Sequence, residues 1–269
     1  MPHAHTLSNG RAQDLERIRI ALAAAVEALR RLGSGVWVAH KAGGDPVTAA
    51  DEAVNEILRR VLPREEEGWL SEDMADDLSR LERRRVWIVD PLDGTREFVA
   101  GIPEWCVSIG LVEDGTAVAG GICNPATGEV FVGASGLGVT LNGRPVRIRQ
   151  LHTLEGCEVL ASRSEVGRGE WQAAHAPFRV RPMGSVAYKM ALVAAGLADA
   201  TWTLTPKNEW DVAAGAALLR AAGGVVATLA WQEPTFNGRD PKLRGLIAVP
   251  PGLASPLRHY LGRRLPEVA

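Results

Sequence analysis

The stretch WIVDPLDGTREF, Trp87 to Phe98, joins an apolar run to two aspartates, Asp90 and Asp93. The residues before Asp90 predict a buried strand from Val86 to Val89. Carboxylates at the end of a buried strand are costly unless a positive group neutralises them. A type I turn is the plain alternative, because Asp and Pro favour it. That turn needs only one aspartate, so the pair indicates a site for a positive group.

Three further acids open or interrupt regular segments: Asp51, Glu72 and Asp211. Each has a structural alternative. Asp51 fits a capping box with Thr48, Glu72 fits a solvated loop, and Asp211 fits a helix N-cap. The six histidines and three cysteines show no spacing typical of a zinc site. A set of carboxylates without such ligands favours a hard cation, with Mg²⁺ first and Mn²⁺ or Ca²⁺ as substitutes.

The DPLDGT turn also has features that suit an anion. Pro91 stiffens the turn after Asp90, and Gly94 and Thr95 can offer backbone N–H groups. If a helix begins there, its N-terminus attracts a phosphate. The hydroxyl of Thr95 can orient a water molecule. The motif therefore combines donors for a metal, a phosphate and a water within about six residues.

Composition excludes several classes of protein. The chain has 269 residues, 46% of them hydrophobic and 23% charged, with a formal net charge of −2. That balance offers no basic field for a nucleic acid polymer or an anionic membrane. The sequence has no apolar run of bilayer length and no signal peptide pattern, and its cysteines are few and scattered. We therefore expect a cytoplasmic protein with reduced thiols. Only four of its thirty basic residues are lysines: Lys41, Lys189, Lys207 and Lys242.

Periodicity predicts helices followed by a meander in the first half of the chain. Helical spacing covers residues 12–33 and 47–63, and the acidic residues 63–77 form a polar loop or a short turn of helix. After the strand at Val86, alternating residues separated by turn dipeptides predict an antiparallel meander. Its strands are expected at 105–112, 116–123, 128–134 and 138–141.

The second half alternates between the two periods, which predicts layers of helix and sheet. Strands are expected at 158–162, 179–183, 199–204, 225–229 and 245–249. Helices are expected near 170–176 and at 185–198 and 212–224. We predict two subdomains packed as one unit, residues 1–150 with DPLDGT and residues 151–269 with EWDVAAG.

DPLDGT together with WDVAAG about 118 residues later resembles the two signatures of the inositol monophosphatase family, which is magnesium-dependent and lithium-sensitive. The segments DPVTAAD, SED, GSVAYKMALVAAGLAD and FNGRDPKLRGLIA follow the family's order. The resemblance covers roughly residues 11–250. It implies a mixed α+β and α/β fold, a layered α-β-α-β-α sandwich like that of the inositol monophosphatases and fructose-1,6-bisphosphatases.

Within the family the sequence is most similar to the CysQ-type 3′(2′),5′-bisphosphate nucleotidases. The shared segments are LSED, RRVWIVDPLDGTREF, SRS at 162–164 and NEWDVAAG. Inositol-specific members tend to carry glutamate seven residues before the second-motif aspartate, where this chain has Leu204. Two departures stand out. Asp73 replaces the second of two glutamates after the serine, and Arg96 replaces a lysine that many nucleotidases have.

The resemblance also implies roles for individual residues. Two Mg²⁺ ions, which Mn²⁺ can replace, would be held by Glu72, Asp90, the Leu92 carbonyl, Asp93 and Asp211. Asp51 would support a third, weaker ion. The catalytic residues would be Glu72 and Thr95, which orient the attacking water, with Asp51. The substrate would contact Gly94, Thr95, Ser185, Lys189, Asp211 and Lys41. Surface positions are the alternatives for Lys41 and Lys189.

The resulting expectation is a magnesium-dependent phosphomonoesterase acting on a small phosphorylated metabolite. The leading substrate is 3′-phosphoadenosine 5′-phosphate. The alternatives within enzymes are inositol-1-phosphate, fructose-1,6-bisphosphate and histidinol phosphate. A different class, a non-catalytic regulator that binds metal or a phosphometabolite, would be favoured by loss of Thr95 or a metal-binding acid, and all are present. The resemblance leaves a homodimer open.

Overall fold

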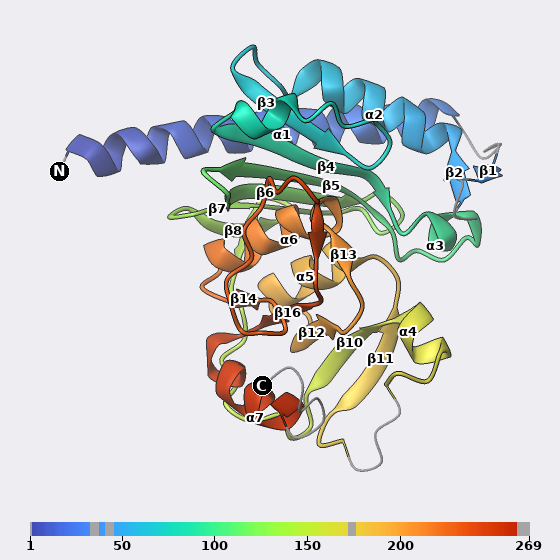
Figure 1. Cartoon of the computed structure of the whole chain (residues 1–269), viewed down its shortest axis with the longest axis vertical. Helices are drawn as coiled ribbons and strands as arrows, with labels where there is room; N and C mark the ends of the chain where they lie inside the picture. The colour runs from blue at the N-terminus through green and yellow to red at the C-terminus, as the bar shows by residue number, and fades with distance from the viewer. Residues whose placement is uncertain (1, 33–37, 41–45, 172–175, 263–269) are drawn as a thin grey trace.

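The computed structural model describes residues 2–32, 38–40, 46–171 and 176–262. Its elements form five alternating layers of helix and sheet (Figure 1). This confirms the layered α-β-α-β-α sandwich expected from the sequence. Among the described residues, no helix combines the length and apolar character that a bilayer span requires.

The larger sheet has seven strands in the order β3-β4-β5-β6-β7-β8-β9. The pair β3–β4 is parallel and every other pair is antiparallel. The meander predicted from the alternating pattern is therefore present. The strands are β3 (Glu67–Ser71), β4 (Arg85–Asp93), β5 (Cys106–Glu113), β6 (Thr116–Asn124), β7 (Glu129–Ala134), β8 (Gly138–Leu141) and β9 (Arg144–Val146).

The smaller sheet is mixed and has five strands in the order β11-β10-β12-β16-β14. Strand β10 pairs in parallel with β11 and β12, and the remaining pairs are antiparallel. Its strands are β10 (Glu158–Ser162), β11 (Arg179–Met183), β12 (Ala200–Thr203), β14 (Val225–Ala227) and β16 (Leu246–Val249). Two short ladders join β1 (Val38–His40) to β2 (Pro46–Thr48) and β13 (Lys207–Asn208) to β15 (Lys242–Leu243).

The helices form the other three layers. Helices α1 (Pro2–Leu32) and α2 (Ala49–Val61) cover one face of the larger sheet, where Ile18, Leu22 and Leu58 are buried. Helices α5 (Val186–Ala194) and α6 (Glu209–Ala221) lie between the two sheets. The outer face of the smaller sheet packs on α7 (Ala254–Gly262). Short helices complete the fold: η1 (Ser79–Glu82), α3 (Thr95–Val99), α4 (Arg163–Gly167) and η2 (Pro251–Leu253).

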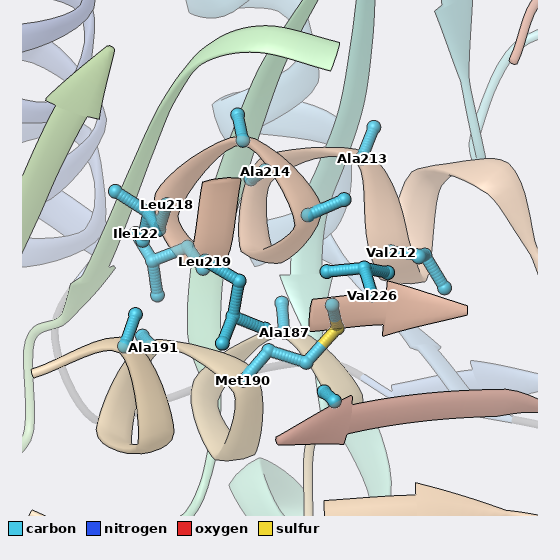
Figure 2. Close-up of a cluster of buried hydrophobic side chains, with 14 of the residues drawn as sticks. Ile122, Ala187, Met190, Ala191, Val212, Ala213, Ala214, Leu218, Leu219 and Val226 are labelled. Atoms are coloured by element: carbon cyan, nitrogen blue, oxygen red, sulfur yellow. The ribbon is translucent and has the colours of Figure 1, made fainter. Parts of the chain in front are cut away.

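The middle layer holds the main core. Small residues of α6 and the side chains of α5 interdigitate there with Ile122 of β6 and Val226 of β14 (Figure 2). Two glycines of the larger sheet permit the close approach of α6. A Cβ at Gly110 would lie 2.7 Å from the Cβ of Ala213, and a Cβ at Gly120 would lie 2.5 Å from the Ala214 carbonyl oxygen. Glycine at these positions thus sets the depth at which α6 sits on the sheet.

Some predicted elements differ from those observed. The acidic stretch predicted as a polar loop or a short turn of helix contains strand β3. Trp69 and Leu70 of this strand pack in the core, and the surrounding acidic residues masked this pattern in the sequence. The helix predicted near residues 170–176 is wrong for its first residues. The helical turn is α4, which starts directly after Ser162, and residues 169–171 form a turn while 172–175 lie outside the described residues. The division into residues 1–150 and 151–269 stays a prediction.

Candidate active site

Asp90 and Asp93 face the same side of the larger sheet because of an irregularity in β4. Residues three apart in a regular strand point to opposite faces. Here Asp90 lies opposite Ser108, and Asp93 lies opposite Cys106, so that β4 has one more residue than β5 over this interval. Such a bulge re-aims a side chain. Both carboxylates therefore face the α5–α6 layer, and both are buried.

Asp211 reaches the same point from α6. It is the third residue of that helix, and its Oδ2 accepts the backbone N–H of Asn208 at 2.9 Å in a capping box. The alternative that Asp211 is the N-cap is wrong, because Asn208 holds that position. Oxygen atoms of Asp90, Asp93 and Asp211 lie within 4.8 Å of one another. The two motifs thus converge on one cluster.

Glu72 joins this cluster through the parallel pairing of β3 with β4. Ser71 lies beside Val89 in the register, so the next residues of the two strands, Glu72 and Asp90, emerge at the same edge. The Glu72 N–H donates to the Val89 carbonyl at 3.4 Å. The close carboxylate of Glu72 contributes to the raised pKa of Asp90. A parallel edge thus explains how an acid from a supposed loop reaches the buried aspartates.

Burial and mutual repulsion raise the pKa values of the clustered carboxyl groups. For Asp90, burial comes first and the charges of Glu72 and Asp93 follow, and together they raise its pKa well above 3.8. Burial also raises the pKa of Asp93. Burial, followed by the charge of Asp93, raises the pKa of Asp211 to about 8. Three ionised carboxylates are therefore unfavourable in this cluster unless a cation neutralises them.

The donor set fits a hard divalent cation. All the clustered groups are carboxylates, and zinc-type histidine or cysteine ligands do not join them among the described residues. Ser108, which lies opposite Asp90, has a fully buried hydroxyl without a hydrogen-bond partner in the described part of the chain. An orphaned hydroxyl at this position suits a site with water bound to a cation. The residues present therefore fit Mg²⁺.

The turn after Asp93 places Thr95 and Asp51 together. Gly94 has φ 97°, a left-handed conformation that glycine adopts without strain, and Thr95 then begins α3. The Thr95 hydroxyl lies 3.0 Å from the Leu92 carbonyl oxygen and 3.4 Å from the Asp51 Oδ1. Asp51 itself is buried in α2. Asp51 thus contacts Thr95 but is not among the residues that line the cavity, and its support of a third ion stays a prediction.

Ser185 and Lys189 lie beside Asp93, at the N-cap and in the first turn of α5. The Ser185 hydroxyl donates to Asp93 Oδ2 at 2.6 Å, and the Ala187 N–H donates to the same oxygen at 2.7 Å. The Lys189 ammonium donates to the carbonyls of Met183, Gly184 and Ser185, at 3.3, 3.3 and 2.8 Å. Burial lowers the pKa of Lys189 to about 8. Because its three N–H groups have carbonyl acceptors, Lys189 can act on a substrate through its charge.

These groups line one cavity of about 310 Å³. Its lining also includes four cationic side chains, Arg96, Arg163, Lys189 and Lys207. The remaining lining residues are Glu72, Asp90, Leu92, Asp93, Gly94, Thr95, Glu97, Ser162, Ser164, Gly184, Ser185, Val186 and Asp211. The cavity thus combines carboxylates that can bind a cation with cationic side chains that can bind an anion.

The sequence-predicted site residues are largely brought together. Asp51 lies behind Thr95, and Lys41 lies outside the described residues. Sequence reasoning assigned no role to Lys207, which belongs to β13 just before α6. The scarcity of lysine was the one signal available, and two of the four lysines line this cavity. The part of Arg163 was indicated only through the SRS segment.

A layered fold whose two motifs gather carboxylates beside cationic side chains defines a metal-dependent phosphatase. A sequence model described as the inositol monophosphatase family matches residues 12–261. The chain belongs to the inositol monophosphatase family, whose members are phosphatases.

Individual relatives agree with this assignment. An inositol-1-monophosphatase of Rhizobium meliloti (strain 1021) is 32% identical over 86% of this chain and 88% of its own length. The structure of an inositol monophosphatase from Anabaena (Nostoc) sp. PCC 7120 superposes with a TM-score of 0.74 at 27% identity, covering 93% and 95% of the two chains. CysQ from Bacteroides thetaiotaomicron gives 0.74 at 27% identity, covering 88% and 97%.

Proposed function

We propose that this phosphatase is a Mg²⁺-dependent phosphomonoesterase that acts as a 3′(2′),5′-bisphosphate nucleotidase. It hydrolyses 3′-phosphoadenosine 5′-phosphate to AMP and phosphate. The observation that supports the proposal is the pairing, in one cavity, of the carboxylate cluster with four cationic side chains. A substrate with one phosphate at the metal-binding carboxylates and a second anionic group at the cationic side chains matches both.

The carboxylates are assigned to the cation. Glu72, Asp90, Asp93 and Asp211, with the Leu92 carbonyl, would hold two Mg²⁺ ions, and Asp51 would support a third. When bound, Mg²⁺ reverses the local charge and lowers the pKa of water. The number of ions is part of the proposal.

The neighbouring residues position water and phosphate. Glu72 and Thr95 orient the attacking water, and the backbone N–H groups of Gly94 and Thr95 face the phosphate oxygens. The oxygen of water forms a bond to phosphorus while the bond from phosphorus to the 3′-oxygen breaks. Water loses a proton, and the departing 3′-oxygen takes up a proton, so that the product carries a neutral 3′-hydroxyl. Because the transition state is stabilised mainly by charge and positioning, the reaction proceeds without a covalent intermediate between phosphate and protein.

Lys207 is the best candidate for the second anionic group. Its ammonium lies 3.5 Å from Glu165 Oε1, and this is the one ion pair that it makes among the described residues. Glu165 already accepts hydrogen bonds from Thr203, Thr205 and Trp171. Burial acts to raise the pKa of Glu165, but these hydrogen bonds outweigh it and lower the pKa. Lys207 therefore retains hydrogen-bonding capacity that a substrate anion can use.

Inositol-1-phosphate hydrolysis is the second candidate. It is favoured by the relative from Rhizobium meliloti, which is named an inositol-1-monophosphatase. Against it, Leu204 stands where inositol-specific members tend to have glutamate, and its side chain packs in the apolar cluster around Trp202. Leu204 offers no acceptor for inositol hydroxyls, and the neutral inositol ring has no second anionic group to bind the cationic side chains of the cavity.

Phosphate release from 3′-phosphoadenosine 5′-phosphate, inositol-1-phosphate and fructose-1,6-bisphosphate tests the proposal, with Mg²⁺ or EDTA present. We expect a Mg²⁺-dependent preference for the bisphosphonucleotide that is lost in Asp93→Asn. A preference for inositol-1-phosphate would refute the substrate and keep the metal site. Equal activity of Asp93→Asn and the unaltered enzyme would refute the site.

A further inference from the structure

Glu104 lies between two glycines, Gly94 and Gly184, that both line the cavity. It stands in the loop between α3 and β5. A Cβ at Gly94 would lie 2.9 Å from the Glu104 carbonyl oxygen, and a Cβ at Gly184 would lie 2.8 Å from that same atom. Both distances are shorter than real Cβ contacts allow. Residue 104 is thus packed between the DPLDGT turn and the turn that precedes α5.

The carboxylate of Glu104 joins three segments. Its Oε2 accepts the backbone N–H of Gly184 at 2.8 Å and also accepts from the guanidinium of Arg163. Arg163 begins α4, and its Nε lies 3.6 Å from Glu97 Oε1 of α3. The Glu104 side chain is 21% exposed, so these contacts are partly shielded from solvent. A single carboxylate therefore fixes the loop after α3, the start of α4 and the turn at Gly184.

That turn has an unfavourable backbone conformation. Ser185 has φ 53° and ψ 122°, a conformation that is strained for a non-glycine residue. The surroundings must therefore hold it in place. On the α5 side, the Ser185 hydroxyl accepts the Tyr188 N–H at 3.0 Å and Lys189 binds the turn carbonyls. On the other side, Glu104 binds the Gly184 N–H.

The Gly184–Ser185 turn also holds the carboxylate of Asp93, which we assign to the metal site. Ser185 and the Ala187 N–H both donate to Oδ2 of Asp93. These two hydrogen bonds set the orientation of the Asp93 carboxylate, which lies in the cluster with Asp90 and Asp211. A displacement of the turn would therefore rotate the Asp93 carboxylate although every acidic residue of the site is still present.

We propose that Glu104 is a positioning residue for metal binding. By accepting the Gly184 N–H it holds the strained Gly184–Ser185 turn, and through Ser185 it sets the orientation of Asp93. Arg163 keeps the Glu104 carboxylate in place. Glu104 touches no reacting atom. The inference rests on the proposed Mg²⁺-dependent function, and it concerns geometry that exists before metal binds.

Three variants in the full chain test this role. Glu104→Met and Glu104→Ala remove the acceptor, whereas Glu104→Gln keeps an oxygen for the Gly184 N–H. Glu170→Met is the matched control, because Glu170 also pairs with an arginine, Arg168, but lies on the surface outside the cavity lining. Hydrogen exchange of the Gly184–Ala187 amides is measured in metal-free protein, and Mg²⁺ binding is measured by calorimetry.

Loss of the acceptor is expected to speed amide exchange at Gly184–Ala187 about fivefold, as one hydrogen bond is lost. It is expected to weaken Mg²⁺ binding about 10- to 100-fold, as is typical when a group that orients a ligand is removed. The fall in phosphatase activity should appear in kcat at saturating substrate rather than in KM. Glu104→Gln should restore most of each property, and Glu170→Met should change none.

Unchanged exchange and Mg²⁺ binding in Glu104→Met would overturn the proposal, as would equal effects in Glu104→Gln. If neither Glu104→Met nor Glu104→Ala folds while Glu104→Gln does, the residue is structural and the proposal is wrong. If the unaltered protein binds no Mg²⁺, the proposed function fails, and the exchange measurement alone decides whether Glu104 holds the turn. Mg²⁺ binding without turnover of any phosphate ester would refute the function while leaving this test intact.

Discussion

Replacement of Lys207 by methionine separates recognition of a second anionic group from the chemistry of the reacting phosphate. Methionine keeps much of the length and apolar character of the lysine side chain and removes only the ammonium. Lys207 is 16% exposed at the side chain, and within the described part of the chain it makes a single ion pair, at 3.5 Å, with Glu165. Because that glutamate is satisfied by neutral donors, Lys207→Met should leave the wall around it folded.

The size of the effect follows from the kind of bond that is lost. A hydrogen bond to a charged group contributes about 1.5–3 kcal/mol. Partial exposure weakens it through solvent screening, so the lower part of that range applies, and kcat/KM falls about 10- to 30-fold. The positive charge of Lys207 also acts to lower the pKa values of Asp93 and Asp211. That influence reaches the metal site and is the same for every substrate.

A comparison of two substrates cancels the common part. The assay measures kcat/KM at saturating Mg²⁺ for 3′-phosphoadenosine 5′-phosphate and for 3′-AMP, which has the reacting phosphate but lacks the 5′-phosphate. The ratio of the two constants should fall about 10- to 30-fold in Lys207→Met and partly recover in Lys207→Arg. Lys242→Met, an exposed lysine on the neighbouring strand β15, is the control. An unchanged ratio in Lys207→Met would refute the assignment.

Two further predictions concern packing and protons. Gly110→Ala places a Cβ 2.7 Å from the Cβ of Ala213 and should lower the free energy of unfolding, measured by urea denaturation, by about 1–3 kcal/mol. Gly167→Ala, whose Cβ meets open space, is the control. Equal stability of the two variants would contradict the packing argument. Because burial raises the pKa of Asp211 to about 8, the metal-free site binds protons that Mg²⁺ must displace. Proton release on Mg²⁺ binding and an apparent affinity that rises with pH up to about pH 8 should appear in calorimetry, and a pH-independent affinity would contradict this.

The sequence was most informative where chemistry and local structure coincide. The apolar run before Asp90 predicts a strand, and β4 is present. The predicted strand end at Val89 is wrong, because β4 continues through both buried aspartates to Asp93. The register irregularity that turns Asp93 to the same face was not predictable, because a bulge is set by pairing with β5. Glu72 was named as a candidate from the sequence and received its metal-binding role from the resemblance, while the strand that delivers it was missed because acidic residues obscure its alternation.

Residues that act across long separations were beyond the reach of the pattern. The Gly184 N–H donates a hydrogen bond to Glu104, yet no sequence pattern predicts that these two residues are in contact. Lys207 stood out only as a rare lysine, since its position beside the cavity depends on how β13 meets α6. Periodicity predicts an element and its buried face, whereas these contacts are made by loops and turns from different layers, which periodicity does not describe.

The place of α6 between the two sheets also has a consequence for synthesis of the protein. The larger sheet is complete at Val146, whereas the helix that covers its inner face ends at Ala221. At about 5–20 residues per second, a ribosome needs several seconds to make the intervening chain. During that interval the nascent sheet presents Ile122 and Phe131 without their partners from α5 and α6. We therefore expect the emerging chain to need chaperones that shield apolar surface, until the helix bearing Asp211 closes the core and the site together.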